Sequence, residues 1–155
     1  MIPRGWLLPI LALCTFSVAL AEPMGDVMTA GTSWYDCQQH GSSGRMLAAD
    51  ESGALHLTWT KSFDSNLYYS HVFYNIWNAD NSSFLWNGGL QVDAASRASY
   101  VTQATTPDGR CYPLYNGAQS AQSAIDFLPR AGAFVIPTSQ WPFLFARFWA
   151  CSHTS

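Results

Sequence analysis

Two stretches of this chain, 56 residues apart, carry the same arrangement of apolar and turn-forming residues. They are residues 43–59 and 99–115. Each predicts a strand, a tight turn that ends at Gly53 or Gly109, and a second strand, because acidic residues and glycine are favoured in such turns. The chain therefore contains two related β-hairpins.

The spacing continues upstream of both hairpins. Residues 31–36 and 88–93 each begin with glycine and end with aspartate, at a spacing of 57. A period of this length, with several short strands in each unit, is typical of a repeating β-architecture such as a propeller. We therefore predict an all-β fold of antiparallel, four-stranded, blade-like sheets, which together make a partial β-propeller with little helix.

The predicted units are residues 31–87 and 88–136. In the first unit, alternation of apolar and polar residues predicts strands at 45–49, 54–60 and 67–77 and the start of a fourth at 84–86. The turn at 50–53 is expected to be exposed. The buried residues are predicted to be Leu55, Leu57, Trp59, Val72, Tyr74 and Ile76.

The second unit is less regular. Strands are expected at 123–128 and 133–136, after the second hairpin. Pro113 falls inside a predicted strand, although proline cannot donate to a central ladder.

The N-terminus has the layout of a secretory signal peptide. One arginine, an apolar run and the small-residue site Ala19-Leu20-Ala21 precede Glu22. We predict cleavage after residue 21, a leader at 22–30, and a secreted, periplasmic or cell-surface protein. No apolar stretch long enough to span a membrane follows the signal.

The C-terminal tail, residues 137–155, is rich in aromatic residues and has no closing element. It predicts either a last strand, a partner surface or a truncated piece of a longer protein. Truncation is favoured, because complete proteins avoid open edges with exposed aromatic residues. The chain expressed alone is then expected to self-associate.

Charge and cysteine content exclude several classes of function. Arg4 is removed with the predicted signal peptide, and the remaining chain carries six basic and ten acidic residues. Lys61 is its single lysine. Nucleic acid is therefore not an expected partner. After signal removal the cysteines are Cys37, Cys111 and Cys151, whose pairing stays open. The scattered histidines predict no metal site, and no cofactor motif occurs.

Residues 44–59 and 72–77 resemble the repeats of sialidase-like, Asp-box-type β-propellers of secreted bacterial proteins. In those repeats an Asp-x-x-Gly turn precedes a His-containing strand and a Tyr-bearing strand follows. The resemblance extends over residues 31–134 and implies about two blades of a propeller. The Asp-box itself has only a partial counterpart at 78–84, where its serine, glycine and tryptophan are replaced.

No catalytic residues are predicted. The exported chain has only Glu22 and Glu51 as glutamates, and its arginines match no sialidase motif. We expect a binding or structural module. The alternatives are a fragment of a sialidase-type glycoside hydrolase whose catalytic residues lie outside this chain, and a small β-sandwich with lectin-like binding.

The aromatic residues of the first unit are the best indication of a binding site, because rings on end loops can stack on sugars or anchor a protein. A glycan or an extracellular protein is the expected partner. The candidate ligand-binding residues are Trp34, Tyr35, Arg45, His71, Trp77 and Arg97.

Overall fold

The computed structural model describes residues 25–35, 38, 44–118 and 120–137. The predicted signal peptide, the tail beyond residue 137, Cys37 and Cys151 lie outside these residues. In the described part of the chain the sheets are antiparallel and no helix occurs, which confirms the all-β prediction. No helix suited to crossing a membrane is found there.

The first sheet is built from consecutive strands. Its order is β1-β2-β3-β4, and β5 pairs with a separate part of β3. The bounds are Leu47–Ala49 for β1, Leu55–Ser62 for β2, Ser70–Asn78 for β3, Ser83–Phe84 for β4 and Leu90–Gln91 for β5. The four strands predicted for this unit are confirmed.

The second sheet is shorter and divided. Strands β6 (Ala98–Thr105), β7 (Cys111–Gly117) and β8 (Ala121–Ser123) form one sheet, and β9 (Ile125–Asp126) pairs with β10 (Phe134–Val135). The Pro113 carbonyl accepts from the Ala124 N–H at 3.0 Å, but proline has no N–H to return. This missing donor coincides with the break between β8 and β9.

The two predicted hairpins have the same register. The pairing of Leu47 with Leu57 recurs, 56 residues later, in the pairing of Gln103 with Pro113. The turns agree as well: Gly53 and Gly109 have φ angles of 81° and 88°. The predicted 56-residue relation between the hairpins is thereby confirmed.

The two hairpins also contact each other. The Arg45 N–H donates to the Thr102 hydroxyl at 3.0 Å, although the residue equivalent to Arg45 at a spacing of 56 is Val101. The Glu51 N–H donates to the Pro107 carbonyl at 3.2 Å, so the two turns are also in contact.

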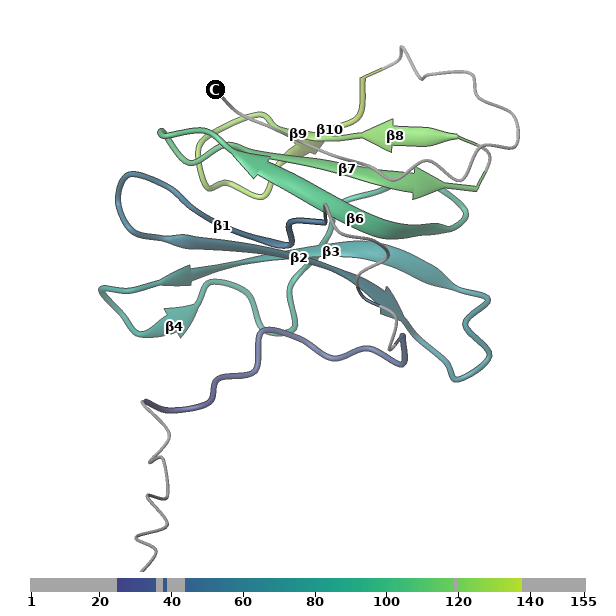
Figure 1. Ribbon diagram of the computed structural model, residues 1–155, viewed down its shortest axis with the longest axis horizontal. Coiled ribbons are helices and arrows are strands. Elements are labelled where there is room, and N and C mark those ends of the chain that lie inside the picture. Colours follow the sequence, from purple (N-terminus) through teal and green to yellow (C-terminus); the bar gives the residue numbers. More distant parts are fainter. Residues whose placement is uncertain (1–24, 36–37, 39–43, 119, 138–155) are drawn as a thin grey trace, which may run out of the picture.

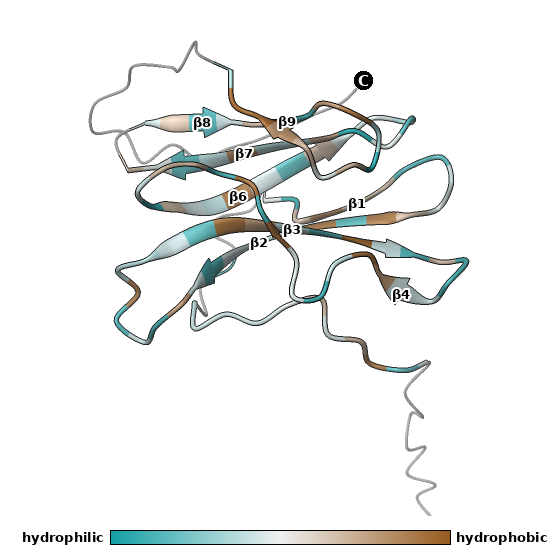
Figure 2. Ribbon diagram, turned by 180° about the vertical axis from the view of Figure 1, so that it is seen from behind, coloured by the Kyte–Doolittle hydropathy of each residue, from teal (hydrophilic) through white to brown (hydrophobic). Residues whose placement is uncertain are grey.

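The two sheets form two layers that face each other (Figure 1). The core between them combines apolar side chains of β3 with side chains of β6 and β7, namely Val72, Tyr74, Ile76, Val101, Cys111 and Tyr115. Figure 2 shows apolar stretches in β1, β3 and β9, whereas many of the connecting loops are hydrophilic.

The sequence prediction for the face of β2 was wrong. Leu55, Leu57 and Trp59 are only half-buried. The face of β2 that meets the second sheet carries polar residues, including His56 and Thr60, because these make the contacts between the layers. The Thr60 hydroxyl accepts from the Tyr100 N–H at 3.1 Å, for example.

The exposed turn predicted at 50–53 is confirmed only in part. Glu51, Ser52 and Gly53 are exposed, but Asp50 is 8% exposed. Its Oδ1 accepts from the backbone N–H groups of Ser52 and Ala54, at 2.8 and 3.2 Å. These bonds turn the carboxylate inward and close the turn.

Candidate functional site

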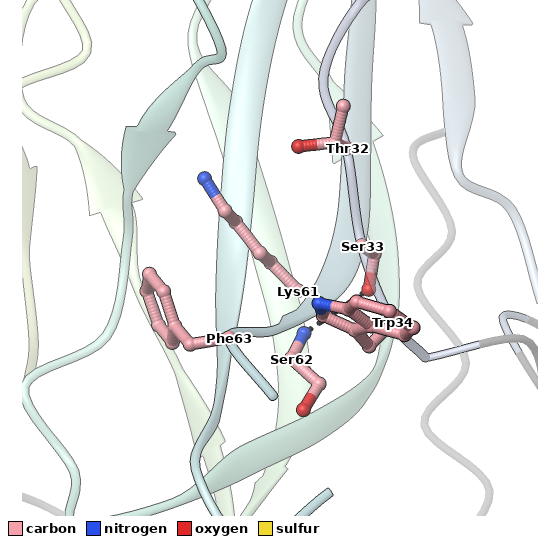
Figure 3. A pocket seen from close by; sticks show the side chains of 6 residues that line it. All are labelled: Thr32, Ser33, Trp34, Lys61, Ser62 and Phe63. Atoms are coloured by element: carbon pink, nitrogen blue, oxygen red, sulfur yellow. Dashed lines mark hydrogen bonds between the residues drawn. The ribbon is translucent and has the colours of Figure 1, made fainter. Parts of the chain in front are cut away.

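An open hollow of about 430 Å³ lies where the segment before residue 35 runs along the end of β2. Ser33 fixes this segment: its hydroxyl donates to the Thr60 carbonyl at 2.9 Å and accepts from the Ser62 N–H at 3.0 Å. The hollow is lined by Thr32, Ser33, Trp34, Lys61, Ser62 and Phe63 (Figure 3).

Two exposed rings border this hollow. Trp34 is 65% and Phe63 51% exposed, which is unusual for side chains of this size. In Figure 3 the Lys61 side chain runs between Phe63 and Thr32, and the Thr32 hydroxyl lies on the side of Lys61. The Lys61 ammonium is 4.4 Å from the ring centre of Phe73 and 5.3 Å from that of Phe63. Cation–π attraction therefore holds Lys61 in place.

More aromatic surface lies in the connection from β2 to β3. Tyr68 is 72% and Tyr69 64% exposed, and both precede β3 directly. The Tyr69 carbonyl accepts from the Phe63 N–H at 3.2 Å, which closes this connection at the hollow. This end of the first sheet thus presents several exposed rings.

His71 lies beside the hollow. Its Nδ1 is 2.9 Å from Oδ1 of Asp93, and its ring is 6.0 Å from that of Phe63. Asp93 is itself held by the Val72 N–H, which donates to Oδ2 at 2.7 Å. A carboxylate on Nδ1 fixes the orientation of the imidazole. His71 also pairs in register with Lys61 across the two strands.

A second polar cluster is buried between the sheets. His56 Nε2 is 3.1 Å from Asp50 Oδ2, and its Nδ1 is 2.6 Å from the Tyr74 hydroxyl. Arg130 donates from Nε to the same Asp50 oxygen at 2.5 Å. His56 and Tyr74 are 0% exposed, so no substrate reaches them. The cluster connects the turn of the first unit with the loop after β9.

The protonation states in this cluster follow from burial and hydrogen bonding. Burial would raise the pKa of Asp50, but hydrogen bonds from Ser52, Arg130 and His56 outweigh it and hold that pKa well below the usual value. Burial lowers the pKa of His56, against the opposing effect of Asp50. A neutral His56 donates a hydrogen bond from Nε2 to Asp50 and accepts one at Nδ1 from the Tyr74 hydroxyl.

Of the six predicted ligand-binding residues, Trp34 lines the hollow and His71 reaches it through Phe63. Tyr35 is 8% exposed and packs edge-on against Tyr100. Trp77 packs on Phe84, toward the other end of β3.

Arg45 and Arg97 are exposed, and the contacts of Arg45 with Thr102 involve its backbone groups. Neither arginine lines the hollow. The sequence prediction omitted Lys61 and Phe63. The available signals were the single lysine of the chain and an aromatic residue within the polar stretch 61–66.

Comparisons with protein-family models, with curated proteins and with solved structures gave no match for this chain. Among the residues that the structure describes, no three His, Cys, Asp or Glu side chains are grouped to hold a metal ion.

Proposed function

We propose that the protein is an exported carbohydrate-binding module, with the hollow between Trp34 and Phe63 as its binding site. The observation that carries the proposal is the pair of exposed rings beside a lysine and hydroxyl groups in one concavity. The apolar faces of sugar rings stack on aromatic side chains, and sugar hydroxyls need donors and acceptors nearby. The volume of the hollow suits one or two sugar rings.

The lining favours binding over hydrolysis. Glycosidases commonly use two carboxyl groups, or a tyrosine nucleophile in sialidases. The six residues that line the hollow include neither a carboxylate nor a tyrosine. Of the carboxylates near the hollow, that of Asp93 is buried and bonded to His71 and to the Val72 N–H. That of Asp64, which follows Phe63, accepts from the Asn66 N–H at 3.0 Å.

We further propose that the two sheets are neighbouring blades of a sialidase-like β-propeller. Innermost strands of neighbouring blades surround a common axis, so equivalent residues of successive blades approach each other. The contact of Glu51 with Pro107, which are 56 positions apart, is of this kind. The first sheet also has the sequential order β1-β2-β3-β4, as a four-stranded blade requires.

Export is proposed from residues 1–21. N-terminal sequencing of the protein recovered from the medium or periplasm should begin within a residue or two of Glu22. A secreted form that retains Met1 would contradict the cleavage site.

The binding proposal is tested by titration calorimetry with a panel of neutral, acidic and amino-sugar oligosaccharides. Trp34→Ala and Phe63→Ala should each weaken binding at least about tenfold, which corresponds to about 1.4 kcal/mol. Phe127→Ala is the matched control, because Phe127 is 63% exposed in the loop between β9 and β10 and does not line the hollow.

Unchanged affinity in both hollow variants would reject the site. An equal loss in Phe127→Ala would indicate a non-specific effect and would also reject it. If no oligosaccharide of the panel binds, the carbohydrate class is wrong.

A further inference from the structure

Asparagine is followed by glycine twice in this chain, at Asn87-Gly88 and at Asn116-Gly117. Such a pair can react with itself, because the main-chain nitrogen after the asparagine can attack the side-chain amide and close a five-membered ring. Glycine leaves this nitrogen unhindered, since it has no side chain. In a folded protein the reaction then depends on how freely the nitrogen and the amide can approach each other.

The reacting groups of the first pair, in the connection between β4 and β5, are unrestrained. Asn87 is exposed. Among the described residues, neither its side-chain amide nor the Gly88 N–H forms a hydrogen bond. The turn is closed by the Gly89 N–H, which donates to the Trp86 carbonyl at 3.4 Å, longer than is usual for such a bond. Rotation about Asn87 therefore breaks no strong hydrogen bond.

The second pair is held in a sheet. Asn116 is half-buried in β7 and pairs in register with Ser99 of β6 and Ala121 of β8. The Gly117 N–H donates to the Ser120 carbonyl at 2.8 Å. Ring closure at Asn116 requires this bond to break and the end of β7 to leave its ladder. The chain thus contains one unrestrained and one restrained copy of the same reactive sequence.

We propose that Asn87 is a site of spontaneous deamidation in the folded protein. The Gly88 nitrogen loses its proton to solvent base and bonds to the side-chain carbonyl carbon of Asn87. The bond from this carbon to the amide nitrogen breaks, and ammonia leaves with a proton taken from water. Water then opens the ring. Attack at the side-chain carbonyl gives aspartate, and attack at the main-chain carbonyl gives isoaspartate, so each event consumes one water molecule and releases one ammonia.

The position of the turn gives this reaction a structural consequence. Asn75 of β3 holds the turn, because its Nδ2 donates to the Trp86 carbonyl at 2.8 Å and its Oδ1 accepts from the Trp86 N–H at 3.2 Å. Gly89 lies directly on the Trp59 ring, where an added Cβ would collide with ring carbons. Isoaspartate lengthens the main chain by one carbon atom between these two fixed contacts. The separated isoaspartyl form should therefore unfold at a lower temperature than the unmodified protein.

Peptide mass spectrometry after incubation of the folded protein at mildly alkaline pH tests the proposal. Asn87 should gain the mass difference between an amide and a carboxyl group at least about tenfold faster than Asn116, because the hydrogen bonds at Asn116 raise its barrier. A methyltransferase specific for isoaspartate should label the peptide that contains residue 87. In guanidinium chloride both asparagines should react at similar rates, since neither is then restrained.

Asn87→Gln should abolish the acidic species that ion-exchange chromatography separates from the wild type, because glutamine would have to close a slower, six-membered ring. Asn81→Gln is the matched control. Asn81 is also exposed, but a serine follows it, and the Ser82 N–H donates to the Ala79 carbonyl at 3.3 Å. This variant should form the acidic species as fast as the wild type.

Equal rates at Asn87 and Asn116 in the folded protein would overturn the proposal, because the reaction would then proceed from the unfolded chain. So would an Asn87 that reacts only in guanidinium chloride, or acidic species that persist in Asn87→Gln. An isoaspartyl form with an unchanged unfolding temperature would contradict the role given to the turn.

Discussion

Arg130 bonds to Asp50 across 80 positions of sequence, with its Nε donating to Oδ2 at 2.5 Å. Its backbone N–H also donates to the Gly109 carbonyl at 2.9 Å. One residue of the loop after β9 therefore holds the turns of both hairpins. The Asp50 side chain is 0% and that of Arg130 38% exposed, so the pair is partly screened by water.

We expect Arg130→Met to lower the free energy of unfolding by about 1–2 kcal/mol. This value is that of a charge-assisted hydrogen bond, reduced because the arginine is partly exposed to water. The control is Arg110→Met, because Arg110 pairs with Asp108 while both side chains are 40–53% exposed. That substitution should change stability by less than about 0.5 kcal/mol. Equal effects in urea unfolding of the two variants would contradict the role of Arg130.

Stability should fall as the pH is lowered from 7 to 5, with His56 contributing. Burial lowers the pKa of His56 in the folded protein, whereas an unfolded histidine titrates near about 6.5. Below that pH the unfolded chain binds more protons than the folded chain, so the free energy of unfolding decreases. Because the pKa of Asp50 is also lowered, its contribution is lost at still lower pH, from about 4 downward.

Urea unfolding at several pH values measures this dependence. His56→Gln should show a shallower decline than the wild type between pH 7 and 5. An identical decline in the variant would show that other groups cause the acid sensitivity.

The glycines at the ends of the two turns should differ in their tolerance of alanine. Both glycines have positive φ, which is unfavourable for alanine. Nothing lies within 4 Å of a Cβ added at Gly53, so Gly53→Ala should lower the free energy of unfolding by about 1–2 kcal/mol, from the backbone conformation alone. At Gly109 the Cβ would lie 2.8 Å from atoms of Arg130 and Asp50. Gly109→Ala should therefore lower the free energy of unfolding by at least about 1 kcal/mol more than Gly53→Ala does. Equal shifts in thermal unfolding would contradict the packing at Arg130.

Cys111 should be unreactive in the folded protein. It is fully buried, its thiol donates to Gln103 Oε1 at 2.7 Å, and burial raises its pKa well above the ordinary value. Thiolate is the reactive form, so iodoacetamide at neutral pH should label Cys111 only after unfolding. Peptide mass spectrometry measures this. Labelling of the native protein as fast as of the denatured one would place Cys111 at the surface.

The sequence predicted the local structure better than the packing. The turns at Gly53 and Gly109 were recognisable because their residues suit only a few backbone conformations. The strand positions followed from alternation, which gives the two faces of a strand but does not say which face is buried. In β2 the leucine-bearing face was assigned to the core by hydrophobicity, although His56 and Thr60 make the contacts with the second sheet.

The candidate site was only partly predictable for a related reason. Trp34 and His71 were selected from a local excess of aromatic and ionisable residues. Lys61 and Phe63 join them only because Ser33 fixes the segment 32–35 along the end of β2. A contact over 27 positions leaves no periodic signal in the sequence.

The equivalent register of the two hairpins does not extend to the side chains at their contact. At the contact between the sheets β2 presents Thr58 and Thr60, whereas β7 presents Cys111 and Tyr115, which are equivalent to Leu55 and Trp59 on the other face of β2. An exchange of one hairpin sequence for the other would therefore keep the strand register but bring unlike side chains into the contact. The two 56-residue segments are thus no longer interchangeable.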